Sequence, residues 1–299
     1  MNPARSMLFT PGDRLDMIEK AGRSGADAVI VDLEDAVSQE NKTEARANLS
    51  QLPASPAPFY VRTNAADTPQ FWDDVAAAGQ AGTVGLVVPK AESPETISQV
   101  DGALTALEKA SGKPHGALTV VPLIESAIGV RRTYDIATAS SRVECVMFGG
   151  GEQGDLVADL GAEWTPEGTG LMHARSEVLL SARAAGIPYP MEAVFMDFRN
   201  LDGLRVEAEM ARTLGYVGKV AIHPAQVPVI NDVFTPAPDV VEYQRMILEA
   251  FEKAVAEGRA SIAVDGKMVD YAVARVARTI IARAYAASRA EGAQADSGE

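Results

Sequence analysis

Cysteine is nearly absent from this chain, which has one cysteine among 299 residues. A single cysteine excludes an intramolecular disulfide. Cys145 stands in the largely apolar segment 143–148, where a small buried side chain is a better interpretation than a nucleophile or a redox thiol. The chemistry of this protein therefore has to come from other residue types.

Positive charge is also scarce, because 27 lysines and arginines face 41 aspartates and glutamates, for a formal net charge of -14 and a pI near 4.7. Non-specific nucleic-acid binding depends on cations that neutralise phosphates, so this balance argues against it. An anionic ligand would have to be held by local donors.

Long apolar runs are missing as well, since none approaches the roughly 18 residues that a membrane helix needs. The opening residues, 1–5, lack the charged-then-apolar order of a secretory signal. With 47% hydrophobic and 23% charged residues, the composition is that of a globular chain. We expect a soluble, cytoplasmic protein with no membrane partner.

What the sequence does contain is a regular alternation of short apolar runs with segments of helical period, which is typical of βα units. The expected strands are 7–10, 28–32, 59–62, 85–89, 118–124, 143–148, 190–194 and 218–222, and clear helical segments are 14–23, 42–52, 94–110, 174–185 and 204–214. The strands are almost continuously apolar, which indicates burial on both faces. Eight such units predict an α/β fold, a TIM (β/α)8 barrel, with a doubly wound open sheet as the alternative.

The pattern changes after the eighth strand. Prolines at 224, 228, 236 and 238 precede a helical stretch, 239–257, and a pair of short runs around Asp265-Gly266 that resembles a hairpin. A last helix is expected over 270–290. We therefore predict a barrel domain over 1–235 and a C-terminal helical and hairpin extension over 236–299, serving as a lid or in oligomerisation.

Polar residues follow the expected strands at their carboxyl ends, where the active sites of such barrels lie. Each could by itself be a salt bridge or a helix cap, but six strands with polar ends favour an active site. These residues are Asp32, Glu34, Asp35, Arg62, Thr63, Asn64, Lys90, Glu125, Ser126, Asp155, Glu152 and His223.

Ordered motifs along almost the whole chain make it resemble the citrate lyase beta-chain-like family, which includes the malyl-coenzyme A and citramalyl-coenzyme A lyases. The motifs are RSMLFTPG at 5–12, ADAVIVDLEDAV at 26–37, VRTN at 61–64, VPK at 88–90, IESA at 124–127, DLVADLG at 155–161 and GKVAIHPAQ at 218–226. The resemblance implies a TIM barrel and specifies the substrate much less closely.

The same resemblance implies a Mg²⁺ cofactor held by Glu125 and Asp155. Two carboxylates suit this ion, because it prefers oxygen ligands in octahedral geometry and keeps positions for water and substrate. The glycine-rich loop before Asp155 is longer than is common in the family, so Glu152 is an alternative ligand or a supporting hydrogen-bond partner. Backbone N–H groups at Gly149 and the glycines after it are expected to hold a substrate carboxylate.

Two catalytic residues follow from the resemblance, Arg62 and Asp270. Arg62 would bind a substrate carboxylate or stabilise charge on an enolate oxygen, with a salt bridge to Glu34 or Asp35 as the structural alternative. Lys90 is expected to pair with the cluster of Asp32 and Glu34. Asp270 would transfer the proton, and read without the family it is the N-cap of the last helix.

A coenzyme A thioester is the implied substrate, lying near the loop after the first strand and the turn after the eighth. The expected contacts are Phe9, Pro11, Gly12, His223 and Pro224, with Arg5, Arg14 and Lys20 as candidate phosphate contacts. The family's C-terminal segment reaches over the site of a neighbouring subunit, which implies a homotrimer or a multiple of it.

The reaction implied is magnesium-dependent cleavage, or formation, of a carbon–carbon bond in a small 3-hydroxy-carboxyacyl thioester, giving an oxo-acid and an acyl-CoA. Two alternatives stay open. One is a malate synthase-like condensation or thioester hydrolysis, and the other is a beta-type subunit of a citrate lyase complex that acts on an acyl-carrier thioester.

Overall fold

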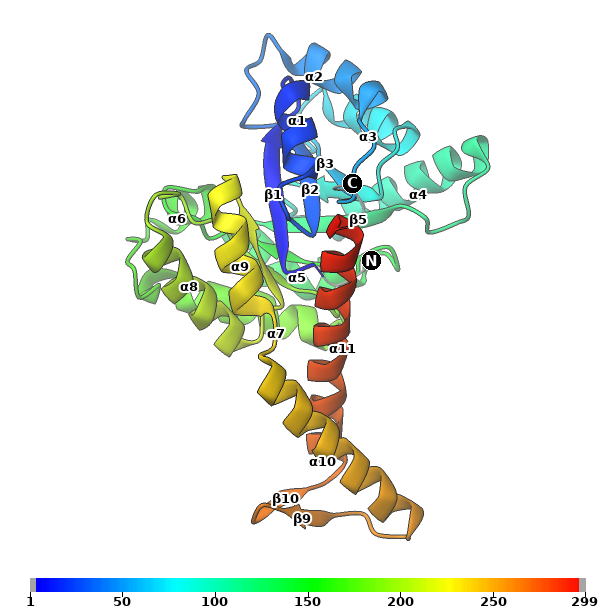
Figure 1. Ribbon diagram of the computed structural model, residues 1–299. Helices are drawn as coiled ribbons and strands as arrows, with labels where there is room; N and C mark the ends of the chain where they lie inside the picture. Colours follow the sequence, from blue (N-terminus) through cyan, green and yellow to red (C-terminus); the bar gives the residue numbers. More distant parts are fainter. Residues whose placement is uncertain (1–3, 296–299) are drawn as a thin grey trace. The chain divides into compact units, whose positions relative to one another are not determined.

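The computed structural model describes residues 4–295, and the chain divides into two compact units, one ending at Phe234 and the next beginning at Thr235. The first unit is a closed barrel in which eight strands pair in chain order, β1 with β2 through to β8, and β8 closes on β1 (Figure 1). All eight pairings are parallel. The predicted TIM barrel is confirmed, and the open doubly wound sheet is excluded.

The strands are β1 Ser6–Pro11, β2 Ala28–Asp32, β3 Phe59–Arg62, β4 Gly85–Val88, β5 Thr119–Ile124, β6 Met147–Phe148, β7 Met191–Glu192 and β8 Gly218–Ala221. The sixth and seventh are shorter than the predicted runs 143–148 and 190–194. Cys145 and Val146 are fully buried although they lie outside β6, because an apolar segment can be buried without joining a strand ladder. An apolar run therefore overestimates strand length at these two places.

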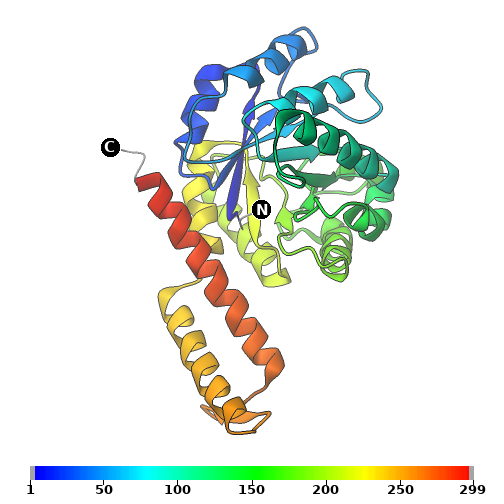
Figure 2. The same cartoon turned by 90° about the vertical axis from the view of Figure 1, so that its right-hand side faces the viewer.

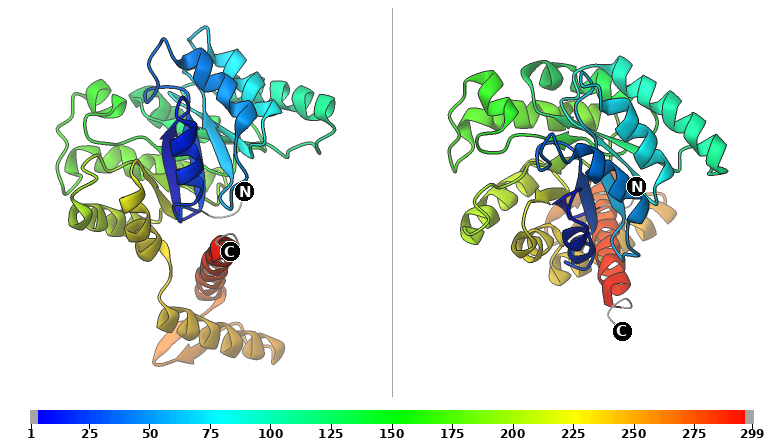
Figure 3. Two further views of the ribbon diagram at one scale, coloured as in Figure 1. Left: turned by 45° about the horizontal axis from the view of Figure 1, so that its top comes forward. Right: turned by 90° about the horizontal axis from the view of Figure 1, so that it is seen from above.

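The helices of the barrel unit lie around the outside of its strands (Figure 3). They are α1 Leu15–Gly22, α2 Lys42–Asn48, α3 Phe71–Gln80, α4 Pro94–Ser111, α5 Ala127–Thr138, α6 Asp155–Leu160, α7 Met172–Ala184, α8 Leu201–Leu214 and α9 Val227–Phe234, with short 3-10 turns at Leu49–Gln51, Thr169–Leu171 and Pro224–Gln226. None of the described helices combines the length and the apolar character needed to cross a membrane.

Alternate strand residues form two separate cores. Leu8, Val29 and Val61 pack in one cluster with helix residues such as Ile18, whereas a second cluster consists mainly of strand residues such as Ile30, Tyr60 and Leu123. Because successive strand residues point to opposite faces, the second cluster is the barrel interior. The residue two places after each interior position faces inward too, and this parity decides which polar residues reach the cavity at the barrel mouth.

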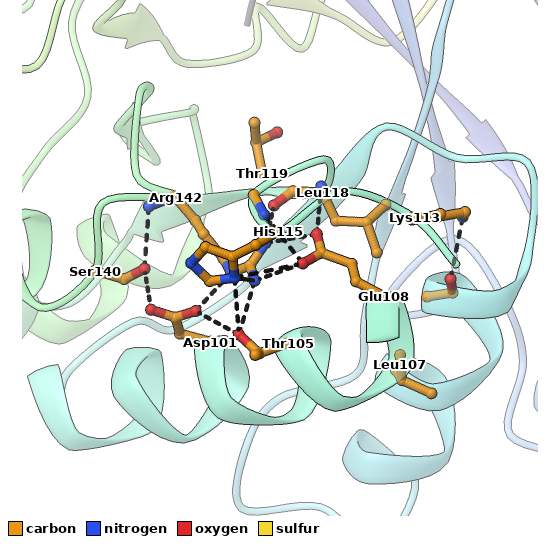
Figure 4. Close-up of polar contacts among 12 residues, drawn as sticks. Asp101, Thr105, Leu107, Glu108, Lys113, His115, Leu118, Thr119, Ser140 and Arg142 are labelled. Atoms are coloured by element: carbon orange, nitrogen blue, oxygen red, sulfur yellow. Dashed lines mark hydrogen bonds and ion pairs between the residues drawn. The ribbon is translucent and has the colours of Figure 1, made fainter. Parts of the chain in front are cut away.

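At the amino end of the strands, one arginine gathers the carboxylates of a neighbouring helix (Figure 4). We define the Arg142 cluster as Arg142, Glu108 and Asp101. The Arg142 guanidinium donates to Glu108 Oε1 at 2.7 Å and Oε2 at 2.8 Å, and to Asp101 Oδ1 at 2.5 Å. These hydrogen bonds, with help from the Leu118 N–H, lower the pKa of Glu108 to about 2 against the opposing effect of burial. The cluster ties α4 to the segment that precedes β6.

The second unit is a helical hairpin. Helices α10 Pro238–Ala256 and α11 Tyr271–Ala295 run side by side in opposite directions, joined through β9 Ile262–Val264 and β10 Lys267–Val269 (Figures 1 and 2). The turn between the two strands uses positive φ at Asp265 (+48°) and Gly266 (+73°), as a tight hairpin turn requires. Ile247, Phe251 and Val269 form its small core with Ala274. The predicted helical and hairpin extension is confirmed.

Candidate active site

A cavity of about 930 Å³ lies at the carboxyl ends of the barrel strands. The site residues named from the sequence that line it include Phe9, Pro11, Asp32, Asp35, Arg62, Glu125, Gly149, Glu152, Asp155, His223 and Pro224. They come from strands or loops after β1, β2, β3, β5, β6 and β8. Positions separated by more than two hundred residues are thus brought to one place by closure of the barrel.

Three of these residues face the cavity because of strand parity. Asp32, Arg62 and Glu125 each follow an interior residue by two positions, after Ile30, Tyr60 and Leu123 respectively. All three are buried, with 1%, 9% and 8% of their surface exposed. At the carboxyl ends of these strands, charged side chains therefore take the inward-facing positions that apolar side chains occupy deeper in the barrel, and the cavity begins there.

Arg62 is held from two sides. Its Nε donates to Asp32 Oδ1 at 2.7 Å and its Nη2 to Asp32 Oδ2 at 2.6 Å, and its guanidinium carbon lies 4.7 Å from the centre of the Phe9 ring. Its Nη1 approaches Glu34 Oε2 at 3.0 Å and Asp35 Oδ2 at 3.4 Å. Burial disfavours the charged guanidinium, but Asp32 and its neighbours more than offset this and raise the pKa of Arg62. The predicted salt bridges exist, and they fix the guanidinium at the cavity wall.

Glu34 and Lys90 lie just behind this wall and do not line the cavity. Glu34 is 6% exposed, and burial, together with the charges of Asp35 and Asp32, raises its pKa to about 7. The Lys90 ammonium lies 3.5 Å from Glu34 Oε1 and 3.6 Å from Asp155 Oδ2. Lys90 therefore pairs with Glu34, as expected, and pairs with Asp155 rather than Asp32.

Glu125 occupies a closely shaped position at the end of β5. Its Oε1 accepts the Lys90 backbone N–H at 2.9 Å. A Cβ added to Gly149 would come 2.5 Å from the Glu125 Cβ and 3.2 Å from its Oε2, so only glycine allows this approach. Burial, and then the charges of Glu34 and Asp155, raise the pKa of Glu125 to about 8. The cavity thus contains a carboxyl group, that of Glu125, whose ionised form a nearby positive charge would stabilise.

Gly149 does not supply a free N–H to a substrate carboxylate, because its amide donates to the Ile124 carbonyl at 2.7 Å. That part of the sequence interpretation is wrong, since strand pairing already uses the donor. Gly154 likewise donates to the Gly151 carbonyl. The glycines serve close packing instead: a Cβ at Gly150 would meet the Phe148 ring at 2.2 Å and one at Gly151 would meet Val194 at 2.9 Å.

Asp155 is the first residue of α6, and Gly154 is the N-cap. Its side chain is 49% exposed and faces Lys90, so it is not itself the helix cap. Glu152 lies in the preceding loop and lines the same cavity, half-buried. Both carboxylates reach the cavity.

Negative charge exceeds positive charge in this group of side chains. We define the mouth cluster as Asp32, Glu34, Asp35, Glu125 and Asp155 with the two cations Arg62 and Lys90, which are the partners in the contacts given above. A hard divalent cation fits such oxygen donors. Within residues 4–295, no three histidine, cysteine, aspartate or glutamate side chains converge as a complete metal site. An ion here would need water or substrate oxygens in addition to Glu125 and Asp155.

The loop after β1 contributes both packing and charge. Gly12 does not line the cavity. Its N–H donates to the Asp32 carbonyl at 2.8 Å, and an added Cβ would lie 2.8 Å from that same oxygen, so it fixes the loop against β2. Arg14 and Lys20 line the cavity and share Asp16 as an exposed partner.

The prediction that Arg5 contacts a phosphate of the substrate is wrong. It precedes β1 at the amino end of the barrel, is 6% exposed, and pairs with Asp27 at 2.9 Å. The residue lies at the opposite end of the strand from the cavity, so it stabilises the start of β1 instead. Because Arg5 comes before β1 in the chain, its sequence position already places it at the amino end of that strand.

His223 makes the structural hydrogen bond expected for its turn. Its Nδ1 accepts the Ala225 N–H at 3.1 Å, and its ring stacks on Phe198 with centroids 4.7 Å apart. The ring also lines the cavity. It is therefore a fixed aromatic wall of the site.

Asp270 belongs to the second unit, where it caps α11. Its Oδ1 accepts the N–H groups of Ala272 at 2.9 Å and Val273 at 3.1 Å, which is the N-cap arrangement. The other carboxylate oxygen, Oδ2, takes no part in these two bonds. The cap role anticipated from sequence alone is thus present.

The sequence did not single out the apolar side chains of the cavity. Met17, Met147, Val194 and Met196 line it together with the charged residues. An apolar residue at a strand end has the same sequence signal as a core residue, so only the fold reveals its position.

Residues 5–224 match the family model described as HpcH/HpaI aldolase/citrate lyase. The chain is 34% identical to citrate lyase subunit beta of Escherichia coli (strain K12), covering 94% of this chain and 93% of that protein. It is also 34% identical to the L-malyl-CoA/beta-methylmalyl-CoA lyase of Rhodobacter capsulatus, with 94% of each chain covered.

A crystal structure of CitE from Mycobacterium tuberculosis, in complex with magnesium, acetoacetate and coenzyme A, superposes with a TM-score of 0.75 at 31% identity, covering 95% of this chain and 98% of that one. The family match spans the barrel and every element that contributes to the mouth cluster. This chain belongs to the HpcH/HpaI aldolase/citrate lyase family.

Proposed function

We propose that this protein is a magnesium-dependent lyase that cleaves or forms a carbon–carbon bond in a small 3-hydroxy-carboxyacyl-coenzyme A thioester, with an oxo-acid and an acyl-CoA on the other side of the reaction. The observation that carries the proposal is the pair Glu125 and Asp155, which line one cavity within a cluster of excess carboxylates. Family membership supports it, because related chains are lyases and one structural relative contains magnesium and coenzyme A.

Glu125 and Asp155 would hold the Mg²⁺. When bound, the ion would accept oxygen atoms of the substrate as further ligands and would make the substrate's hydroxyl group more acidic. Glu125 has to be ionised to bind it, and a nearby divalent charge favours that form in a site where burial alone does not.

Arg62 would hold the carboxylate of the substrate or stabilise negative charge on the thioester oxygen. Asp32 takes up its Nε and one Nη2 hydrogen, which orients the planar group toward the cavity. An arginine held in this way loses little side-chain freedom when a substrate binds.

Asp270 would transfer the proton to or from the carbon that loses its bonding partner. Its Oδ1 caps α11, which fixes the carboxylate at the helix start and leaves Oδ2 for this task. We expect Asp270→Asn to retain Mg²⁺ affinity and to lower kcat. Isothermal titration calorimetry and steady-state kinetics separate the two effects, and a loss of Mg²⁺ binding would contradict this role.

The decisive experiment incubates the purified protein with malyl-, citramalyl-, methylmalyl- and 3-hydroxy-3-methylglutaryl-coenzyme A, each with Mg²⁺ or with a chelator. Oxo-acid release is followed by trapping as a hydrazone. At least one thioester should release an oxo-acid only when Mg²⁺ is present. Absence of release from all four, with no effect of chelator, would rule the proposal out. Free coenzyme A released without an oxo-acid would instead indicate thioester hydrolysis.

A beta-type subunit acting on an acyl-carrier thioester is the second candidate. The specific support is that the chain matches a citrate lyase subunit beta and a malyl-CoA lyase at the same 34% identity. Offering the same acyl group on coenzyme A and on an acyl carrier protein decides between them. Preference for the carrier-bound form in kcat/KM would favour the subunit.

We also propose a homotrimer or a multiple of it, in which Asp270 of one chain serves the barrel of another. Light scattering after gel filtration measures the assembly. Activity recovered by reassembling Asp270→Asn chains with Glu125→Ala chains would show that a site is shared between chains. No recovery from a mixed oligomer would show that each chain uses its own Asp270.

A further inference from the structure

Lys90 touches both candidate metal ligands by different atoms. Its backbone N–H donates to Glu125 Oε1 at 2.9 Å, while its ammonium lies 3.6 Å from Asp155 Oδ2. The same ammonium lies 3.5 Å from Glu34 Oε1. One residue therefore connects three carboxylates of the mouth cluster.

The backbone of Lys90 has an uncommon conformation. Its φ is +47°, in the left-handed region that residues with a Cβ seldom adopt. Such a conformation persists where the surrounding structure holds it, and it is found often at functional sites. The hydrogen bond to Glu125 holds it here, so the residue is constrained at the cavity edge.

The Lys90 ammonium and a divalent cation would share one partner, the Asp155 carboxylate. The Lys90 side chain reaches both Glu34 and Asp155, and two carboxylates beside a lysine favour its charged form. Its ammonium is therefore charged at neutral pH. A cation held by Glu125 and Asp155 would be repelled by that ammonium and would have to share Asp155 with it.

We propose that Lys90 competes with the divalent cation for Asp155. This inference rests on the proposed function, since it assumes the ion at Glu125 and Asp155. Competition keeps the affinity of the two carboxylates for the ion low until a substrate adds its own oxygen ligands. Lys90 is thus a positioning residue that couples metal binding to substrate binding.

Metal affinity without substrate tests the proposal on the full chain. Isothermal titration calorimetry with Mg²⁺, and electron paramagnetic resonance with Mn²⁺, give Kd for the wild type, Lys90→Met and Lys90→Arg. We expect Lys90→Met to bind about tenfold more tightly, ~1.4 kcal/mol, because the repelling charge is gone. Lys90→Arg should stay close to the wild type.

Lys109→Met is the matched control. Lys109 is exposed near the end of α4, so its removal changes the net charge equally but leaves the mouth cluster intact. Its Kd should equal that of the wild type. A tighter Kd in this control as well would overturn the proposal by showing that total charge, rather than Lys90, sets the affinity.

The sign of the effect distinguishes competition from a merely structural role. If Lys90 only held the ligands in place, Lys90→Met would bind metal more weakly. Unchanged or weaker binding therefore overturns the proposal while the magnesium site of the wild type stands. If neither the wild type nor the variants bind Mg²⁺ or Mn²⁺, the proposed function fails, and this inference fails with it.

A measurement on the wild type avoids dependence on the folding of a variant. Reductive methylation of Lys90, followed by mass spectrometry, should become faster when Mg²⁺ is added, because the displaced ammonium leaves Asp155. Lys109 provides the internal reference for reagent activity. No change in the ratio of the two rates, at an Mg²⁺ concentration that saturates the site, would overturn the proposal.

Discussion

The Arg142 cluster and the mouth cluster lie at opposite ends of the same barrel strands and consist of the same chemical groups. In the Arg142 cluster the guanidinium satisfies its carboxylates, and the pKa of Glu108 falls to about 2. In the mouth cluster five carboxylates share two cations, and the pKa values of Glu34 and Glu125 rise to about 7 and about 8. The group in which the guanidinium hydrogen-bonds every carboxylate stabilises the fold, whereas the mouth cluster, in which the pKa values of two buried carboxylates are raised, is suited to bind a cation.

The largest effect is expected on stability, from Arg142→Met. The change leaves the fully buried Glu108 without its partner, and breaking a buried ion pair in this way costs about 3–5 kcal/mol. The free energy of unfolding in urea should fall by that amount, while kcat of the folded protein stays the same.

The control for this change is Arg205→Met. Arg205 pairs with Asp232 at the surface, where both side chains are largely exposed, and such pairs contribute about 0–1 kcal/mol. If the two variants lost equal stability, the Arg142 cluster would contribute no more to the stability of the fold than an exposed ion pair does.

Glu125→Gln should have the opposite effect to Arg142→Met, because it should lower activity and not stability. We expect kcat/KM for the responding thioester to fall by about 10²–10³-fold, the usual cost of removing a strong electrostatic contact in a site. Burial raises the pKa of Glu125, so its ionisation costs folding stability as pH rises from the unfolded value, about 4.3, to about 8.

Without added metal, Glu125→Gln should therefore be more stable than the wild type at pH 9 and equal to it at pH 4. Thermal melts at the two pH values measure the difference. A variant that is less stable at pH 9 would show that Glu125 is a structural residue like Glu108.

Gly149→Ala tests the close packing of Gly149 against Glu125, one of the two proposed metal ligands. The new Cβ would lie 2.5 Å from the Glu125 Cβ, so the carboxylate has to move. Displacing the support of a metal ligand usually lowers metal affinity or activity by about 10–100-fold. Gly102→Ala is the control, since an added Cβ there meets nothing within 4 Å. Equal kinetics in the two variants would contradict the close approach.

The smallest effect concerns acid stability. Since hydrogen bonds from Arg142 lower the pKa of Glu108 below its unfolded value, the stabilisation is complete above about pH 4.3 and is lost as pH falls toward about 2. Glu108→Gln should therefore reduce the slope of stability against pH in this window. Circular dichroism during acid titration measures it, and an unchanged slope would assign acid unfolding to other carboxylates.

Periodicity predicted eight βα units, because short, continuously apolar runs alternate with longer segments of helical period. It left both the closed barrel and the open sheet possible, and the strand pairing decides for the barrel. Periodicity overestimated the lengths of β6 and β7, and Cys145 and Val146, just before β6, are buried without belonging to that strand. Burial and ladder pairing have the same apolar signature, so their extents could not be separated in advance.

The candidate site was predictable where residue type and strand end coincide. Asp32, Arg62 and Glu125 are charged residues at the ends of apolar runs, and the structure shows that all three have the inward parity. Arg5 was placed at the wrong end, and the Gly149 amide was given a role that the Ile124 carbonyl already occupies. Hydrogen-bond partners depend on neighbouring strands, which the local sequence does not name.

The sequence by itself determined the alternating βα pattern, the family resemblance and the residue types of the mouth cluster, because these depend on local periodicity and on motifs within single segments. Only the tertiary structure decided the charge balance. Closure of the barrel brings Glu34, Lys90, Glu125 and Asp155 within hydrogen-bonding or ion-pairing distance, and burial there raises the pKa values of two carboxylates. Electrostatic interactions act through space, so the sequence can list the charges but cannot say which of them share a site.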